Sequence, residues 1–313
     1  MTYRSRHLCI VLLGLFASTS CAETVAVCPP EGGVALQVLG SGGPIADDGR
    51  ASTGYIVWVD GEARVLIDAG GGTFLRFGEA EAEFTSLDFV GLSHFHADHS
   101  ADFPALLKSG NFSGRKRPLA IAGPGAGGPF PGLHAWLTSL IDGDAGAFGY
   151  LSGYLDGSGG LVKLEPVEIS RDIPEPVTVF GDDESDLQID TMPVPHGIVP
   201  ALGFSVRVGD ATIVFSSDQN GGDPSFIDFA KNANVLVMHM PIPEGATGGA
   251  LQLHAPPSVI ASIANEAEVE TLLLSHFMAR SLRNLEENTD VVREGFDGTI
   301  AVAGDLDCLV VTD

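Results

Sequence analysis

The sequence predicts one large domain of mixed α and β structure. Three observations predict it: apolar runs with strand character dominate, helical patterns lie between them, and no low-complexity linker divides the chain. Hydrophobic residues make up 44% of the 313 residues, which is enough for a sizeable core. The composition therefore argues against a disordered chain.

Strand and helix patterns alternate along the chain. Asp60 and Gly61 lie between two apolar runs and predict a hairpin. The glycine-rich stretch 123–160 is expected to be a loop-and-helix insertion. We expect helices within residues 100–110, 130–141, 224–233 and 256–268, and strands within 33–43, 53–72, 87–94, 117–124, 177–181, 187–197, 202–218, 233–241, 269–277 and 298–313.

The first 22 residues are expected to be an export signal. Two arginines precede an apolar stretch at residues 8–17, which is too short to span a bilayer, and small residues then favour cleavage after Ala22. A lipoprotein cysteine at Cys21 is the alternative. We therefore expect a single domain over residues 23–313 of a periplasmic or secreted protein, without a transmembrane segment.

Loss of the signal would leave Cys28 and Cys308 as the two cysteines of the mature chain. Cysteines near opposite ends of an exported domain favour one disulfide that ties the ends together. The alternative is a pair of free buried thiols.

The chain is strongly acidic, with a formal net charge of −25. Such a surface repels polyanions, so a nucleic-acid partner would require a local basic patch. The best candidate patch, residues 115–117, is more typical of a solvated turn. We expect a small-molecule substrate and no nucleic-acid partner.

Histidines and an aspartate crowd into the motif "HFHADH", residues 94–99, directly after an apolar strand pattern. In an extended segment His94 and His96 point to the same side, because strand side chains alternate with period two, so together they can bind one cation. Asp98 and His99 follow where the chain turns into a helix and are suited to a second ion. Surface or core histidines are the alternative, but so many ligand-type residues in six positions favour a metal site.

The motif resembles the H-x-H-x-D-H signature of the metallo-β-lactamase superfamily. Other segments resemble the remaining motifs of that superfamily, in the expected order, from about residue 34 to the C-terminus. These are "LGSGG" with the strand-end Asp68, "PVPHG" with His196, "VFSSD" with Asp218 and "LLLSHF" with His276.

The resemblance implies two divalent metal ions. Imidazole and carboxylate ligands suit Zn²⁺, although Mn²⁺ or Fe would accept the same set. Asp68 is expected to orient a ligand histidine without touching metal. The implied ligands are His94, His96 and His196 for one ion, Asp98, His99 and His276 for the other, and Asp218 as a bridge between them.

Within the superfamily the chain looks closest to the branch of ribonuclease Z, the arylsulfatases and the phosphodiesterases. His239 in "VLVMHMP" lies where ribonuclease Z has a histidine followed by Glu-Ala-Thr, and His254 in "LQLHAPP" lies near its His-Ser-Thr loop; both matches are partial. Either histidine is a candidate catalytic general acid, and Asp98 is the third catalytic candidate. His134, in the insertion, is expected to be a surface or lid residue.

The expected function is that of an exported dinuclear metal-dependent hydrolase. The two ions would lower the pKa of a shared water, so that metal-bound hydroxide attacks a phosphodiester, cyclic nucleotides included, or an aryl sulfate ester. The transfer RNA substrate of ribonuclease Z fits badly with export and with the net charge. One alternative is a lactone or β-lactam hydrolase with the same metal site, which a tyrosine over the site (Tyr150 or Tyr154) would favour. The others are a di-iron redox enzyme and a non-catalytic binding protein.

The resemblance also sharpens the fold expectation. It implies an α/β protein with a four-layer αβ/βα sandwich, in which two sheets lie face to face with helices outside and the metals bind at one edge. The insertion at 123–160 is expected to cover the metals.

Overall fold

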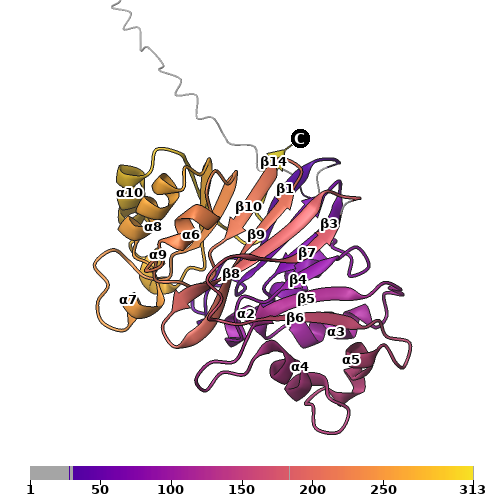
Figure 1. Ribbon diagram of the computed structural model, residues 1–313. Coiled ribbons are helices and arrows are strands. Elements are labelled where there is room, and N and C mark those ends of the chain that lie inside the picture. The colour runs from indigo at the N-terminus through magenta and orange to yellow at the C-terminus, as the bar shows by residue number, and fades with distance from the viewer. Residues whose placement is uncertain (1–27, 29–30, 183, 313) are drawn as a thin grey trace, which may run out of the picture.

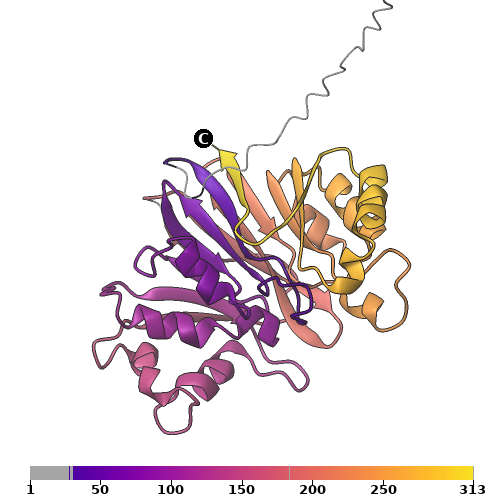
Figure 2. The same ribbon diagram turned by 180° about the vertical axis from the view of Figure 1, so that it is seen from behind.

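The computed structural model describes residue 28, residues 31–182 and residues 184–312. The expected export signal and Cys21 lie outside the described residues. Two seven-stranded sheets pack face to face, and helices cover the outer face of each (Figures 1 and 2). This confirms the expected four-layer α/β sandwich.

The first sheet contains the N-terminal half of the chain and the last strand. Its order is β14 (Cys308–Thr312), β1 (Val34–Gly40), β2 (Gly54–Val59), β3 (Glu62–Ile67), β4 (Phe89–Gly91), β5 (Leu119–Pro124) and β6 (Leu164–Ile169). Strands β3 to β6 run parallel, and β14, β1, β2 and β3 are antiparallel neighbours. The expected hairpin joins β2 to β3, and both turn residues, Asp60 and Gly61, have positive φ, as a type I′ turn requires.

The second sheet is built from the C-terminal half. Its order is β13 (Thr299–Val302), β12 (Thr271–Ser275), β11 (Val235–His239), β10 (Ala211–Phe215), β9 (Val199–Val208), β8 (Leu187–His196) and β7 (Val177–Asp182). Strands β10 to β13 are parallel, while β7 to β10 form an antiparallel meander.

Two groups of helices cover the sandwich. On the first sheet lie α1 (Thr73–Glu79), α2 (Ala97–Ser100), α3 (Phe103–Gly110), α4 (Leu133–Ile141), the 3₁₀ turn η1 (Gly149–Leu151) and α5 (Gly153–Asp156). With the second sheet lie α6 (Ser225–Phe229), α7 (Ala250–Leu253), α8 (Pro257–Glu266), α9 (Ala279–Leu282) and α10 (Leu285–Gly295). In the described part of the chain, no helix combines the length and the apolarity that a membrane crossing requires.

The core has two parts because the inner strands are buried on both faces. In β1, Leu36 and Val38 join the cluster that lies between the sheets and extends under α8, whereas Ala35 and Leu39 join the cluster under α1, α3 and α4. A strand buried on both faces is expected to be largely apolar. Every residue of β1 is buried, and its one polar residue, Gln37, hydrogen-bonds with Trp58 and Leu306.

The insertion at 123–160 divides into a loop and a helical part. Leu133, Leu137 and Ile141 of α4 are buried in the cluster on the outer face of the first sheet, so this helix packs on the sheet instead of lying over the histidines. The preceding loop does reach them, since the ring of Phe130 lies 5.8 Å from that of His96. The expected cover over the metals is therefore confined to this loop.

A disulfide joins Cys28 to Cys308, as the cysteine positions predicted, with 5.8 Å between the Cα atoms. Cys308 begins β14, which pairs with β1, so the bridge ties the segment before β1 to the edge strand of the first sheet.

We predict that replacing both cysteines with serine lowers the free energy of unfolding by about 2–4 kcal/mol, because the open chain regains the entropy that closure of a long loop removes. Urea unfolding of the oxidised protein and of the Cys28→Ser, Cys308→Ser variant measures the difference. An unchanged denaturation midpoint would contradict the prediction.

Candidate metal centre

The carboxyl ends of strands from both sheets meet at one edge of the sandwich, and the ligand-type residues lie there. His94 and His96 follow β4, while Asp98 and His99 begin the short helix α2. From the second sheet come His196 at the end of β8, Asp218 after β10, His239 at the end of β11, His254 after α7 and His276 after β12.

His94, His96 and His196 form the first group of ligand-type side chains. His94 Nε2 lies 3.0 Å from His96 Nδ1, and one ring nitrogen from each of the three residues lies within 4.8 Å of the others. His94 and His196 are buried and His96 is partly exposed. The β4 loop and the β8 end therefore converge as the resemblance implied.

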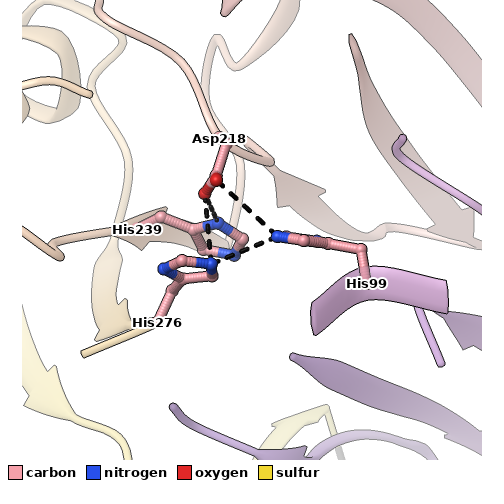
Figure 3. Close-up of side chains that lie close together, drawn as sticks. All are labelled: His99, Asp218, His239 and His276. Atoms are coloured by element: carbon pink, nitrogen blue, oxygen red, sulfur yellow. Dashed lines mark hydrogen bonds and ion pairs between the residues drawn. The ribbon is translucent and has the colours of Figure 1, made fainter. Parts of the chain in front are cut away.

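The second group contains His99, Asp218, His276 and His239 (Figure 3). His99 Nε2 lies 3.1 Å from His276 Nε2, and the Asp218 carboxylate lies 3.4 Å from His276 Nε2 and 3.6 Å from His99 Nε2. Asp98 lies beside this group, with Oδ2 at 3.3 Å from His276 Nε2 and 3.6 Å from His99 Nε2.

Asp218 lies between the two groups. Its Oδ2 is 3.7 Å from His196 Nε2 on one side and 3.6 Å from His99 Nε2 on the other. A carboxylate in this place can bind a cation in either group, or one in each.

Hydrogen bonds fix the ring orientation of two of the histidines. The buried Asp68 carboxylate lies 2.8 Å from His99 Nδ1 and also accepts hydrogen bonds from the amide and hydroxyl of Ser93. The Leu253 carbonyl lies 2.9 Å from His196 Nδ1. Because both partners are acceptors, Nδ1 is the donor in each ring, and Nε2 is directed at the centre.

His239 has a different role from the other histidines. Its Nδ1 lies 2.8 Å from Asp218 Oδ1 and its Nε2 lies 3.1 Å from the Tyr55 hydroxyl, so both ring nitrogens already have partners. Burial, together with the neighbouring His276, lowers the pKa of His239 to about 4, so the ring is neutral at pH 7. His239 therefore supports Asp218 from behind and does not face a substrate.

The hydrogen-bond acceptors around His239 determine which of its ring nitrogens carries the proton. The Asp218 carboxylate only accepts, so His239 Nδ1 carries the proton and Nε2 is an acceptor. Burial raises the pKa of Tyr55, whose hydroxyl stays protonated and lies 3.1 Å from His239 Nε2. The same hydroxyl donates to Ser275 Oγ at 2.8 Å, so these contacts link Ser275, Tyr55, His239 and Asp218. Tyr55 and Ser275 carried no motif, and a contact across the two sheets leaves no signal in one sequence.

Sharp turns at the strand ends direct several of these side chains inward. Asp68, Ser217 and His276 all have positive φ, a conformation uncommon for residues other than glycine. A Cβ added at Gly43 would lie 3.0 Å from His276 Cε1, so glycine there lets the backbone lie against the ring. The segment "LGSGG" therefore forms part of the wall of the centre.

The residues fit divalent metal ions. His196 Nε2, His254 Nδ1 and His276 Nδ1 are buried without a hydrogen-bond partner, and a buried ring nitrogen with neither partner nor cation is unfavourable. Imidazole nitrogens that face each other at 3.0 and 3.1 Å are joined naturally by a cation between them. His239 is set apart by its two hydrogen bonds. The other ligand-type residues at the centre are the seven that the sequence predicted and His254 at the rim.

His254 lies at the rim. Its Nδ1 is 3.9 Å from Asp218 Oδ1, and its side chain is 11% exposed against 3% for His239. The other candidates lie elsewhere: His134 is exposed on α4, Tyr150 is 62% exposed, and Tyr154 donates to the Leu107 carbonyl. Neither tyrosine lies over the centre.

Comparison with known proteins agrees with this geometry. The profile of the beta-lactamase superfamily domain matches residues 63–277. Ribonuclease Z of Mycobacterium bovis is 27% identical over 284 residues, which cover 87% of this chain and 96% of that protein.

Two solved structures share the fold. The metallo-β-lactamase fold protein YhfI from Bacillus subtilis gives a TM-score of 0.68 at 20% identity, covering 88% of this chain and 98% of that one. The short form of human tRNase Z gives 0.67 at 17% identity, covering 89% and 100%.

We predict that Tyr55→Phe weakens metal binding at the centre while it keeps the aromatic ring that packs in the core. Loss of the hydroxyl frees His239 to move its proton from Nδ1 to Nε2, which weakens its support of Asp218. Imidazole ¹⁵N shifts of the metal-free protein should show one His239 tautomer in the wild type and a mixture in the variant. Metal affinity should fall by about 10-fold, the low end for hydrogen-bond partners of ligands.

The matched control is Tyr154→Phe, which also removes one buried hydroxyl and one hydrogen bond, far from the histidines. It should leave the His239 shifts and the metal affinity unchanged. Equal metal affinity in both variants would show that Tyr55 is only a packing residue.

Proposed function

The chain belongs to the metallo-β-lactamase superfamily, and from that premise we propose that it hydrolyses small anionic esters with a pair of divalent metal ions. It is a hydrolase of that fold, and the proposed substrate is a phosphodiester, cyclic nucleotides included, or an aryl sulfate. The observation that carries the proposal is the position of Asp218, whose carboxylate lies between two groups of histidines.

The roles of the residues follow from their positions. The ions, most readily Zn²⁺, would polarise the ester and lower the pKa of a bound water. Asp68 and Leu253 orient ligand rings, and His239 supports the shared carboxylate. We propose His94, His96 and His196 as ligands of one ion, Asp98, His99 and His276 as ligands of the other, and Asp218 as a ligand of both.

We propose His254, ahead of His239, as the group that protonates the leaving oxygen. Both ring nitrogens of His239 are engaged, whereas His254 Nδ1 has no partner and its side chain reaches the rim. Burial lowers the pKa of His254 to about 3. The ring is therefore neutral at pH 7 and would first accept a proton from the attacking water before it passes one to the leaving oxygen. Asp98 remains in the proposal as a ligand carboxylate beside the reacting atoms.

We also propose that the protein works outside the cytoplasm. The basic and apolar residues of 1–22 have the pattern of an export signal, and the disulfide between Cys28 and Cys308 suits an oxidising compartment.

RNA is the second candidate substrate, since a relative that matches most of the chain is named ribonuclease Z. Charge argues against it: the net charge is −25. The basic run at 115–117 offers little to a nucleic acid, because Arg115 donates to the carbonyls of Phe84 and Leu87 and Arg117 pairs with Asp88.

The test of the function is a substrate panel with zinc-loaded protein. Bis-p-nitrophenyl phosphate, a cyclic nucleotide, p-nitrophenyl sulfate, nitrocefin, a homoserine lactone and a precursor transfer RNA are assayed from pH 6 to 9. We expect turnover of a phosphodiester or the sulfate, two metal equivalents per chain, and loss of both activity and one or more metals in Asp218→Ala. A lack of activity on both the phosphodiesters and the sulfate ester would contradict the proposal. Cleavage of the precursor transfer RNA alone would favour RNA as the substrate.

We predict that His254→Ala affects esters according to their leaving group. An alkoxide needs a proton as it departs and p-nitrophenolate does not, so kcat should fall by about 100-fold or more for an alkyl phosphodiester and by only a few fold for bis-p-nitrophenyl phosphate. The metal content should be unchanged. A loss of equal size on both substrates would argue against the role of general acid.

A further inference from the structure

A cavity of about 230 Å³ adjoins the metal centre on the side of the first histidine group. It is lined by the β8–β9 hairpin, by Arg171 after β6 and by Asp223 before α6, and His196 belongs both to its wall and to the histidine group. The loop that precedes α4 brings Phe130 against His96. A group that enters this cavity therefore lies next to the proposed metal ligands.

The cavity wall combines polar and apolar surface, and proline rings form much of its apolar part. Pro193, Pro195 and Pro200 contribute to it from the paired strands β8 and β9. A Cβ added at Gly127 would lie 2.6 Å from Pro200 Cγ and 3.2 Å from Arg171 Nη1, so the loop packs closely against both. Proline-lined walls of fixed shape suit a flat organic group better than a flexible chain.

Arg171 is the one cation that lines the cavity. Within residues 31–182 and 184–312, its side chain makes no hydrogen bond and no ion pair, and it is exposed. Most other arginines of this acidic chain are engaged: Arg64, Arg76, Arg117 and Arg207 with carboxylates, and Arg115 and Arg280 with backbone carbonyls. A free guanidinium in a chain of net charge −25 is available for an anion that comes from outside.

Asp223 limits what the cavity accepts. It lies in the same wall as Arg171, and its Oδ1 accepts hydrogen bonds from the amide and hydroxyl of Ser225 at the start of α6. Its charge weakens anion binding in general, so an anionic group gains from the cavity only where its geometry reaches the guanidinium. Arginine binds carboxylate and phosphate oxygens in a planar, two-pronged geometry.

We propose that this cavity holds the organic part of the substrate and that Arg171 binds a second anionic group carried by it, a carboxylate or a phosphate. This inference rests on the proposed function and names the substrate class: an ester with an anionic charge remote from the ester that is cleaved. Arg171 is then the residue that sets the preference between singly and doubly charged esters.

The experiment compares two phosphodiesters that share p-nitrophenolate as the leaving group. One is bis-p-nitrophenyl phosphate; in the other a carboxylate replaces the nitro group of the remaining ring, a change that keeps the shape and adds one charge. A third ester with a phosphonate at that position separates carboxylate from phosphate recognition. The ratio of kcat/KM between the charged and uncharged esters is measured for the zinc-loaded wild type, Arg171→Gln, Asp223→Asn and, as a control, Lys163→Gln.

We expect the wild type to prefer a charged ester, and Arg171→Gln to lower that ratio by about 10-fold or more, the effect of losing a hydrogen-bonded charge pair. Asp223→Asn, which keeps the acceptor for Ser225, should raise the ratio. Lys163 is exposed at the opposite end of β6, so Lys163→Gln should leave the ratio unchanged. Equal ratios in the wild type and Arg171→Gln would overturn the proposal.

Binding separates this inference from the proposed function. Titration calorimetry compares p-carboxyphenyl phosphate with phenyl phosphate on the wild type and on Arg171→Gln, without any need for turnover. If no ester is hydrolysed but the carboxyl group still strengthens binding in an Arg171-dependent way, the function fails and the subsite stands. If the carboxyl group adds nothing to binding in the wild type, the subsite fails even if the esters are hydrolysed.

Discussion

The whole edge of this sandwich depends on the burial of the Asp218 carboxylate among histidines from both sheets. The surrounding rings of His276, His239 and His99 overcome the effect of burial and hold the pKa of Asp218 well below its usual value. The same carboxylate keeps a proton on His239 Nδ1, and His239 in turn contacts Tyr55, which donates to Ser275 in the core. Several buried ring nitrogens have no hydrogen-bond partner in the protein. A bound cation would satisfy them, so metal binding is expected to stabilise the folded state.

Much of the fold and the centre followed from short-range patterns. Side chains at the ends of parallel strands share an edge whatever the connecting loops do, so the positions of the motif residues were enough to bring them together. Several elements were missed, the short helices α1, α7 and α9 among them, and two of the longer ones were missed for physical reasons. Strand β6 is an edge strand interrupted by Pro166, and α10 buries mainly polar residues, Asn288 and Thr289 among them, so neither shows a clear apolar period.

The roles of individual residues were harder to predict than their location. His239 ends a strand beside the other ligand-type residues, and only the distances to Tyr55 and Asp218 separate support from metal binding. Arg171 carried no motif at all, because a free cation is recognised only by the absence of partners in three dimensions. The residues proposed to choose the substrate lie in the β8–β9 hairpin and in loops, whereas most of the proposed metal ligands lie at or just after strand ends.

The position of the last strand has a consequence for when the centre can form. β1 pairs with β14, and Asp305, just before β14, accepts hydrogen bonds from Ser41 and Ala51 in the segments that border Gly43 and His276. The wall of the centre is thus completed by contacts between residues 264 and 254 positions apart in the sequence. The finished wall requires β14 to have paired with β1, so a metal ion meets a complete site only after the first sheet has closed.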